Sequence, residues 1–482
     1  MSELLGFLGI GLALAVLVVL AYRGWSVLLL APVTALLAAA FSGFPMLATL
    51  TQLFMVGAAG FVAQFFPLFL FGALFAKLMN DSGSVATIAD FMTRMLGRNR
   101  AVLAVVLAGA VLTYGGISLF VAFFVMVPMA QALFDAAGIP RRLVPAAVIL
   151  GTSSFTMTAL PGSPAIQNVI PMPFFGTTLY AAPGLGAIAA VIMLGLGLAW
   201  LRHAEAAARR RAAADASPRG IGADRIREHS TTASTFDPAE IDRGAPSPAR
   251  PSVAVAFVPV VVVVCANLLL SLVVLPAIDA SFLSEPKWGG TTLAAVAGIW
   301  SVVVALALAT LVLVVLNRGR LANLRDSVDA GCHAAVLPAL NVASLVGFGA
   351  VIAALPAFAA IRDWLLDLGG GPLVSLAVAT NLLAGLTGSA TGGLTIALEA
   401  LGPAYMDIAA RTGTDPALMH RVAVIGAGTL DLLPHNGAVV TLLALCGTTH
   451  RESYLDIAVA GIANSMVALI VVILVASVTG SF

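Results

Sequence analysis

Two ionisable residues stand inside an apolar run near the C-terminal end of the chain. Asp431 and His435 are four residues apart, which places both on one face of a continuous helix, and Pro434 lies between them. A charged side chain at the centre of a membrane helix costs about 2.5–3.5 kcal/mol, so residues of this kind are functional candidates. Because a carboxyl group beside an imidazole can exchange protons near neutral pH, the pair predicts a proton-coupling site. A protonated, hydrogen-bonded aspartate that only fixes packing is the alternative.

A second segment combines helix breakers with hydrogen-bonding side chains. The stretch TALPGSPAIQN, Thr158 to Asn168, contains Pro161, Gly162 and Pro164 between long apolar runs. A proline inside a helix costs about 3 kcal/mol and frees a main-chain carbonyl, so we expect this segment to unwind. The polar side chains that it then presents are those of Thr156, Thr158, Ser163, Gln167 and Asn168. The motif predicts half of a substrate site, and a packed proline kink is the alternative.

Two glycine pairs with nearby hydroxyl groups add to this set. Gly115–Gly116 and Gly392–Gly393 permit positive φ angles and can leave the N-terminus of the following helix bare. Bare main-chain amides and the positive end of a helix dipole attract a carboxylate without a buried lysine or arginine. The polar side chains near these pairs and near Asp431 are Thr113, Ser118, Ser389, Thr391, Thr395, Thr429 and Asn436. We predict that they bind substrate, and glycine-rich helix packing is the alternative.

The composition is that of an integral membrane protein. Of 482 residues, 60% are hydrophobic and 10% are charged, and the mean hydropathy is +1.04. Apolar stretches long enough to cross a hydrocarbon core of ~30 Å recur along the chain, so we expect helices to span the membrane. Cys265, Cys332 and Cys446 each stand alone in apolar sequence, so we expect neither a disulfide nor a metal site. No cofactor other than a coupling proton is expected.

One polar segment divides the apolar chain. Residues 202–251 are rich in arginine, proline, serine and alanine, and their arginines outnumber their acidic residues. Such a composition predicts a solvated linker, and the positive-inside rule places it in the cytoplasm. The linker separates an N-terminal membrane half, residues 1–201, from a C-terminal half, residues 252–482.

The two halves resemble each other in sequence. FGALFAKL from Phe71 matches FGAVIAAL from Phe348, and YGGIS from Tyr114 meets TGGLT from Thr391 at the same offset of 277 residues. TMTALPGSP also aligns with TLDLLPHNG after a short shift. Counting the expected crossings between the two copies gives an odd number, so we expect the repeats to be inverted. Inverted repeats with a broken element in each half are typical of secondary transporters, whose site lies near the membrane midplane.

Each half is expected to contain one re-entrant hairpin and one broken helix. The first hairpin is placed at residues 101–135, where two ordinary spans are the alternative, and the second at residues 371–404. The broken helices are placed at residues 143–172 and 417–446. The expected fold class is therefore an all-α polytopic membrane protein, an inverted-repeat secondary transporter with two hairpins and two broken helices.

The segment from Gly115 to Asn168, and above all FTMTALPGSPAIQN, resembles the gluconate permease family of bacterial proton symporters, part of the ion transporter superfamily. The resemblance covers most of both halves, and the long central linker departs from it. It implies proton-coupled import of gluconate or a similar small hydroxylated monocarboxylate across the bacterial cytoplasmic membrane. It also implies an elevator-type homodimer in which a transport domain moves against a scaffold, and the hairpins and broken helices hold the substrate.

Other functions are less well supported by the sequence. A citrate-like acid, hydroxybutyrate or a small amino acid such as serine are alternative substrates, and a single carboxylate is preferred because no lysine or arginine falls within the four polar segments. Sodium coupling is disfavoured because neither tip carries the asparagine of the Ser-Asn-Thr tips that relatives use. A channel would need a polar stripe along several helices. We expect no enzyme, since no Gly-x-Ser-x-Gly or His-Glu-x-x-His motif occurs, and no nucleic-acid partner.

Overall fold

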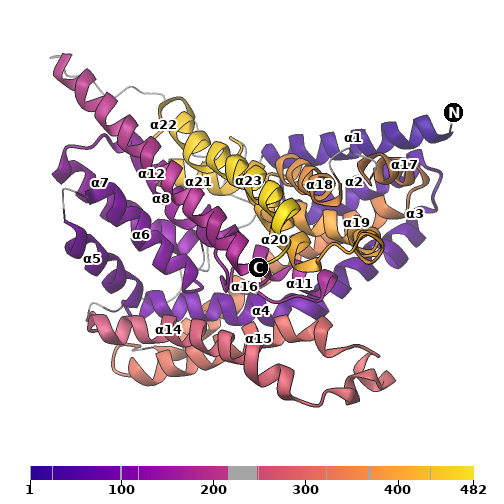
Figure 1. Cartoon of the computed structure of the whole chain (residues 1–482), viewed down its shortest axis with the longest axis horizontal. Coiled ribbons are helices and arrows are strands. Elements are labelled where there is room, and N and C mark those ends of the chain that lie inside the picture. The colour runs from indigo at the N-terminus through magenta and orange to yellow at the C-terminus, as the bar shows by residue number, and fades with distance from the viewer. Residues whose placement is uncertain are drawn as a thin grey trace.

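The computed structural model describes residues 2–23, 25–97, 100–117, 119–214, 247, 249–321, 323–366, 371–434 and 436–482. These residues form helices joined by turns and short loops (Figure 1). The all-helical expectation is therefore confirmed for the part of the chain that the structure describes. Ser118, His435 and most of the predicted linker lie outside the described residues.

The first half begins with two helices and a long helix, followed by a short amphipathic helix, a helical hairpin, a broken segment and a second long helix. These elements are α1 (Ser2–Tyr22), α2 (Val27–Phe41), α3 (Met46–Ala48), η1 (Thr49–Phe54), α4 (Met55–Asp81), α5 (Ser84–Leu96), α6 (Ala101–Tyr114), α7 (Leu119–Ala137), η3 (Arg141–Leu143), α8 (Val144–Thr152), α9 (Phe155–Thr158), α10 (Ile166–Val169), α11 (Pro171–Phe175) and α12 (Pro183–Ala214). The elements from α3 to α4 form one continuous helical run that contains a π-helical turn at η1.

The second half repeats this order of elements. They are α14 (Val253–Leu269), η6 (Leu270–Val274), η7 (Leu275–Ala277), η8 (Ser281–Ser284), η9 (Pro286–Trp288), α15 (Leu293–Leu316), α16 (Leu324–Ala354), α17 (Pro356–Leu366), α18 (Pro372–Thr387), α19 (Ala390–Thr412), α20 (Pro416–Leu430), α21 (Gly437–Cys446), α22 (His450–Ile457), η10 (Ala458–Ala463) and α23 (Asn464–Thr479). The long helix α16 thus corresponds to α4, and the pair α18 and α19 corresponds to α6 and α7.

The two halves pack through a reciprocal exchange of helices. The two long helices α4 and α16 contact each other, α15 of the second half packs on α4, and α2 of the first half packs on α16. In the same way α14 contacts α5, and α1 contacts α17. Gly347 allows α16 to approach η1 closely, because a Cβ atom there would lie 2.6 Å from the carbonyl oxygen of Phe54. The reciprocal contacts agree with an internal duplication of the chain.

Six helical runs within the described residues are long and apolar enough to cross a membrane. They are Met46–Asp81, Pro183–Ala208, Val253–Ala277, Ala295–Leu316, Leu324–Ala354 and His450–Thr479. Large apolar side chains on several of them, such as Val191, Leu272, Leu311 and Leu474, are exposed, as contact with lipid requires. The chain is therefore a multi-pass membrane protein.

The two helix pairs expected at the hairpins are present, but the second tip lies elsewhere than predicted. Gly115–Gly116 joins α6 to α7, and Gly116 has a φ of +84°. The second tip is Gly388–Ser389, with a φ of +61° at Gly388. Gly392–Gly393 lies in the first turn of α19, where its function is packing, because a Cβ atom on Gly393 would lie 2.3 Å from the main chain of Ala384. The prediction of a glycine-pair tip in the second half was therefore wrong.

Other boundaries also differ from those expected. α19 continues to Thr412, beyond the predicted hairpin end at residue 404, although Pro403 lies inside the helix. α12 continues to Ala214, well into the predicted linker, because the first residues of that segment are mainly alanine and arginine, which favour helix. The first broken segment divides into the short helices α8, α9, α10 and α11, a more fragmented arrangement than one kinked helix.

Candidate functional site

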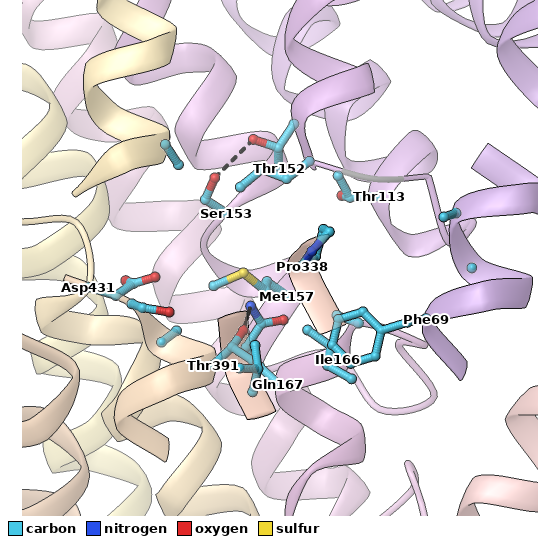
Figure 2. Close-up of a pocket in the computed structure, with 18 of the residues that line it drawn as sticks. Phe69, Thr113, Thr152, Ser153, Met157, Ile166, Gln167, Pro338, Thr391 and Asp431 are labelled. Carbon is cyan, nitrogen blue, oxygen red and sulfur yellow. Dashed lines mark hydrogen bonds between the residues drawn. The ribbon is translucent and has the colours of Figure 1, made fainter. Parts of the chain in front are cut away.

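A cavity of about 310 Å³ lies where the two hairpin tips meet the two broken segments (Figure 2). Its lining comes from the α6–α7 tip, α8 to α10, the α18–α19 tip and the α20–α21 break, together with α4, α15 and α16. Both halves of the chain thus contribute to one cavity. Its volume is at the lower end of the ~300–1,000 Å³ range of small-molecule sites, so the ligand that it fits is compact.

The first broken segment is irregular for the reason that its sequence predicted. Its helix α9 ends at Thr158, and Pro161, Gly162 and Pro164 prevent the helix from continuing. Gly162 has a φ of +78°, and a Cβ atom there would lie 2.7 Å from the ring of Tyr180. The carbonyl oxygen of Pro161 accepts a hydrogen bond from the hydroxyl group of Tyr114, with 2.8 Å between the oxygens. Tyr114 thus stabilises the unwound main chain from the neighbouring hairpin.

Arg421 on α20 binds the first broken segment and the loop between α11 and α12, both in the other half of the chain. Its side chain is fully buried and donates hydrogen bonds to the carbonyl oxygens of Thr158, Leu179 and Ala181 and to Oδ1 of Asn168, at 2.8–3.3 Å. These acceptors are neutral, so the guanidinium brings a positive charge next to Asn168, which follows the cavity residue Gln167. Burial of arginine requires this many acceptors, which is why one side chain bridges several turns of the loop.

His420, the residue before Arg421, binds the same loop. Its Nε2 donates to Oδ1 of Asn168 at 3.2 Å, and its Nδ1 lies 2.6 Å from the hydroxyl oxygen of Thr177. Sequence reasoning missed both residues as parts of the site, because it treated only the segment around Asp431 as polar. An arginine and a histidine side by side in the apolar run after Leu418 were the available signal.

The second broken segment places a carboxyl group in the cavity. Asp431 follows the last residue of α20, is 6% exposed and lines the cavity, and its Oδ1 makes no hydrogen bond within the described residues. Five residues later Asn436 caps the N-terminus of α21, because its Oδ1 accepts from the amides of Ala438 and Val439. The side-chain amide of Asn436 donates to the carbonyl oxygen of Gly388 at 2.8 Å. The break is therefore fastened to the second hairpin tip.

Helix N-termini surround the cavity. The lining includes Leu119 at the start of α7, Ala390 and Thr391 in the first turn of α19, and Gly437 at the start of α21. The first amides of a helix have no acceptor within the helix, and the helix dipole adds a partial positive charge there. In α19 the hydroxyl oxygen of Ser389 accepts a hydrogen bond from the amide of Gly392, so the amides of Ala390 and Thr391 stay available to a ligand. This arrangement suits an anion.

The hairpin tips also contact the first broken segment. The side-chain amide of Gln167 donates to the hydroxyl oxygen of Thr391 at 3.0 Å, across the two halves. The hydroxyl group of Thr113 lies 3.2 Å from that of Thr156, within the first half. In Figure 2, Gln167 and Thr391 lie beside each other, below and to the right of Asp431, and Met157 lies above Gln167.

The structure brings some of the predicted site residues together and separates others from the cavity. The predicted residues that line the cavity are Thr113, Gly116, Gln167, Ser389, Thr391, Asp431 and Asn436. The predicted residues that do not line it are Gly115, Thr156, Thr158, Ser163, Asn168, Gly392, Gly393, Thr395 and Thr429. The hydroxyl groups of Thr156, Thr158, Thr395 and Thr429 donate instead to carbonyl oxygens one turn earlier in the chain. Substrate contact by these nine residues is therefore not supported by the geometry.

Two further polar residues of the lining were not predicted. Thr152 and Ser153, at the end of α8, contribute hydroxyl groups to the cavity, with 3.2 Å between their oxygens (Figure 2). They precede the proline-rich stretch and look like ordinary small residues of a membrane helix, so the sequence contained no signal for them.

The fold, the polytopic helices and the cavity shared by two repeated halves define a membrane transporter. No profile of a known protein family matches the chain. The chain is 42% identical over 453 residues to the uncharacterized transporter YxjC of Bacillus subtilis (strain 168), which covers 92% of this chain and 93% of YxjC. It therefore belongs to the transporter family that includes YxjC.

Two solved transporter structures share the fold. MtrF of Neisseria gonorrhoeae, described as illuminating a class of antimetabolite efflux pumps, superposes with a TM-score of 0.55 at 15% identity, covering 89% of this chain and 84% of MtrF. The YdaH transporter of Alcanivorax borkumensis, described as having an unusual topology, superposes with a TM-score of 0.51 at 18% identity, covering 86% and 85% of the two chains. At these identities the similarity shows the fold alone.

The comparisons confirm that the chain is a transporter, as expected, and do not support the expectation of a gluconate permease. The relatives are described as transporters, in agreement with the expectation that the chain is no enzyme. None of them is described as a gluconate permease, so the resemblance to that family gains no support.

Proposed function

We propose that the protein is a secondary transporter that carries a small organic monocarboxylate together with protons across the cytoplasmic membrane. The observation that carries the proposal is the Asp431 carboxyl group, which lines the same cavity as the helix N-termini of α19 and α21. Gluconate is the particular substrate that the sequence resemblance implies. The Asp431 carboxyl group in the cavity supports protons as the coupling ion.

The electrostatics of the cavity link the anion to the proton. The amides of Ala390 and Thr391 at the N-terminus of α19 attract a carboxylate, whereas an ionised Asp431 in the same small cavity repels it. A proton on Asp431 removes this repulsion, so the anion and the proton bind better together than either does alone. Such mutual stabilisation is the thermodynamic requirement for symport, because each ligand raises the affinity for the other by the same factor.

The charge of the lining favours a substrate with one carboxylate. No lysine or arginine belongs to the cavity lining among the described residues, and Arg421 acts on the site only through Asn168 and the loop behind it. Helix dipoles and bare amides are worth about 0.3–1 kcal/mol each at exposed sites and up to ~2 kcal/mol when partly buried. That is sufficient for one carboxylate, whereas a citrate-like acid would leave charges uncompensated.

The proposal also includes the way in which the site moves. Two repeated halves with a broken segment in each support an alternating-access mechanism in which the hairpins are re-entrant and the repeats inverted. An elevator-type movement and a homodimer are predictions from the sequence resemblance, and so is the cytoplasmic position of the linker at residues 202–251.

The test is uptake of two radiolabelled monocarboxylates, the sugar acid gluconate and the aliphatic acid hexanoate, into liposomes that contain the purified protein. Uptake is measured with and without an inward proton gradient, and with and without sodium. Protein-free liposomes correct for passive diffusion of the protonated acids. We expect sodium-independent uptake that an uncoupler abolishes. Asp431→Asn should lose gradient-driven accumulation and retain exchange of internal for external substrate, because the neutral amide mimics the protonated site.

The matched control is Asp407→Asn on the exposed face of α19, which should behave as the wild type. Gradient-driven accumulation that survives in Asp431→Asn would contradict the coupling role. Accumulation driven by an outward gradient would instead show exchange of substrate for protons, the mechanism of an efflux pump.

A further inference from the structure

The cavity has two chemically different sides. The lining residues contributed by the long helices α4 and α16 and by α15 are all apolar, including Leu68, Phe69, Leu306, Ala335, Pro338 and Val342. The polar residues come from the hairpin tips and the broken segments. Figure 2 shows Phe69 and Ile166 on the side of the cavity away from Asp431.

Much of the hydrogen-bonding capacity on the polar side is already used within the protein. The hydroxyl group of Thr113 donates to the carbonyl oxygen of Gly109 at 2.9 Å, and that of Thr152 donates to Val148 at 2.8 Å. The Asn436 side chain is engaged at both ends, by α21 and by Gly388. The groups left for a ligand are the bare amides, Asp431 and the hydroxyl groups of Ser389 and Thr391, which so far only accept hydrogen bonds. All of them lie on the polar side, which can hold a carboxylate, whereas the side formed by α4, α15 and α16 offers no polar side chain to a chain of hydroxyl groups.

A polyhydroxylated acid would therefore bury several hydroxyl groups against the apolar helices. Each buried hydroxyl group without a partner weakens binding substantially, whereas an aliphatic or aromatic group gains affinity from the same contact. Met157, which also lines the cavity, adapts its shape easily to such a group.

We propose that the substrate is an amphipathic monocarboxylate, whose carboxylate lies at the helix N-termini and whose apolar tail lies against α4, α15 and α16. The inference rests on the proposed function: it keeps a substrate with one carboxylate, and in place of the sugar acid that the resemblance implies it puts an acid with an aliphatic or an aromatic tail. Each methylene group placed against the apolar side should raise the affinity about fourfold, until the tail fills the cavity.

Gly72 on α4 offers a direct test, because it lines the cavity and a Cβ atom there would meet no other atom within 4 Å. A leucine at this position should therefore occupy the tail space without distorting the helix. Gly60 is the matched control: it also lies on α4 with nothing within 4 Å of a built Cβ atom, but it is exposed and does not line the cavity.

The experiment is calorimetric titration of the purified full-length protein with acetate, butyrate, hexanoate and gluconate at one fixed pH. For the wild type we expect affinity to rise from acetate to hexanoate and gluconate to bind more weakly than hexanoate. Gly72→Leu should abolish the gain for hexanoate and leave acetate within about twofold, and Gly60→Leu should keep the wild-type series.

The outcomes separate this inference from the proposed function. Gluconate binding more tightly than hexanoate, a series without any gain, or an equal loss in Gly72→Leu and Gly60→Leu would overturn the amphipathic substrate and leave a monocarboxylate transporter. If folded, monodisperse protein binds none of the acids and transports none, the proposed function fails as well.

Discussion

The side-chain amide of Gln167 donates a hydrogen bond to the hydroxyl oxygen of Thr391, with 3.0 Å between the two atoms. Gln167 belongs to the broken segment of the first half and Thr391 to the first turn after the hairpin tip of the second half. Both residues line the cavity. This bond therefore joins the two repeats at the candidate site.

Breaking the bond between Gln167 and Thr391 is expected to weaken substrate binding. Gln167→Ala and Thr391→Val should each raise the dissociation constant about fivefold, since a hydrogen bond of this kind contributes about 1 kcal/mol. The double variant should lose no more than either single variant, because both remove the same interaction. Calorimetric titration measures the constants, and Thr395→Val, whose hydroxyl group bonds within α19, is the control. Additive losses would show that the two residues act independently.

Arg421 is expected to stabilise the first broken segment together with the loop between α11 and α12. Arg421→Gln should cost about 3–5 kcal/mol, because buried carbonyl oxygens of Thr158, Leu179 and Ala181 lose their donors. Arg421→Lys should not restore stability, since one ammonium group cannot reach these separated acceptors. Thermal unfolding in detergent measures the change.

The control for Arg421 is Arg362→Gln on α17, whose exposed ion pair with Asp363 is worth about 0–1 kcal/mol. If the unfolding midpoint fell equally in Arg421→Gln and Arg362→Gln, the buried hydrogen bonds of Arg421 would not be important for stability, and the prediction would be wrong.

The sequence predicted those features of the site that have a local cause. Pro161, Gly162 and Pro164 interrupt a helix wherever they stand, and Asp431 is conspicuous in any apolar run, so both breaks could be located from composition and spacing. The second hairpin tip was misplaced because the glycine pair used to locate it is also a purely local signal. Glycine pairs have two uses, and only the neighbouring Ala384 main chain shows that Gly392–Gly393 serves packing.

The features that could not be predicted depend on contacts between distant parts of the chain. Arg421 binds Leu179 and Ala181, and nothing within its own segment indicates those partners. Likewise, hydroxyl groups such as those of Thr158 and Thr429 can either face a ligand or bond back to their own main chain, and the choice depends on how the helix is rotated against its neighbours. Sequence periodicity does not determine that rotation in a helix that is apolar on all sides.

The buried ion pair of α4 is expected to respond differently to single and double replacement. Lys77 Nζ lies 3.1 Å from Oδ1 of Asp81, both side chains are 1% exposed, and Ser327 donates to Asp81 at 2.7 Å. Lys77→Met or Asp81→Asn should each cost about 3–5 kcal/mol by leaving one partner unpaired, whereas Lys77→Met with Asp81→Leu should be close to neutral. Thermal unfolding distinguishes the variants. A double variant as unstable as the single ones would contradict this account, and retained acid binding in it would show that the pair lies outside the site.

Gly393 is expected to tolerate no side chain. Gly393→Ala places a Cβ atom 2.3 Å from the main chain of Ala384, so the α18–α19 pair must separate, at a cost of about 1–3 kcal/mol or more. The comparison is Gly413→Ala at the end of α19, where φ is +70° and no atom lies within 4 Å, so only backbone strain of about 1 kcal/mol applies. Gly393→Ala should therefore lower both the unfolding midpoint and the affinity for the acid, and Gly413→Ala only the midpoint. If Gly393→Ala and Gly413→Ala changed the unfolding midpoint and the affinity equally, the close contact between Gly393 and Ala384 would not matter for packing or binding.

The affinity for the acid is expected to fall as pH rises. If the anion binds together with the proton on Asp431, the complex holds one proton more than the free protein above the titration range of that carboxyl group. The dissociation constant should then increase about tenfold for each pH unit in that range and level off at lower pH, where the site is already protonated. Asp431→Asn should bind with the same constant at every pH, because its side chain is neutral throughout. Calorimetric titration of both proteins, in about unit steps between about pH 5 and pH 9, measures the slopes. These pH values are chosen because histidines and buried carboxyl groups commonly titrate within them. A wild-type slope that persists in Asp431→Asn would assign the proton to another group, and His435, four residues further along the chain, would be the next residue to replace.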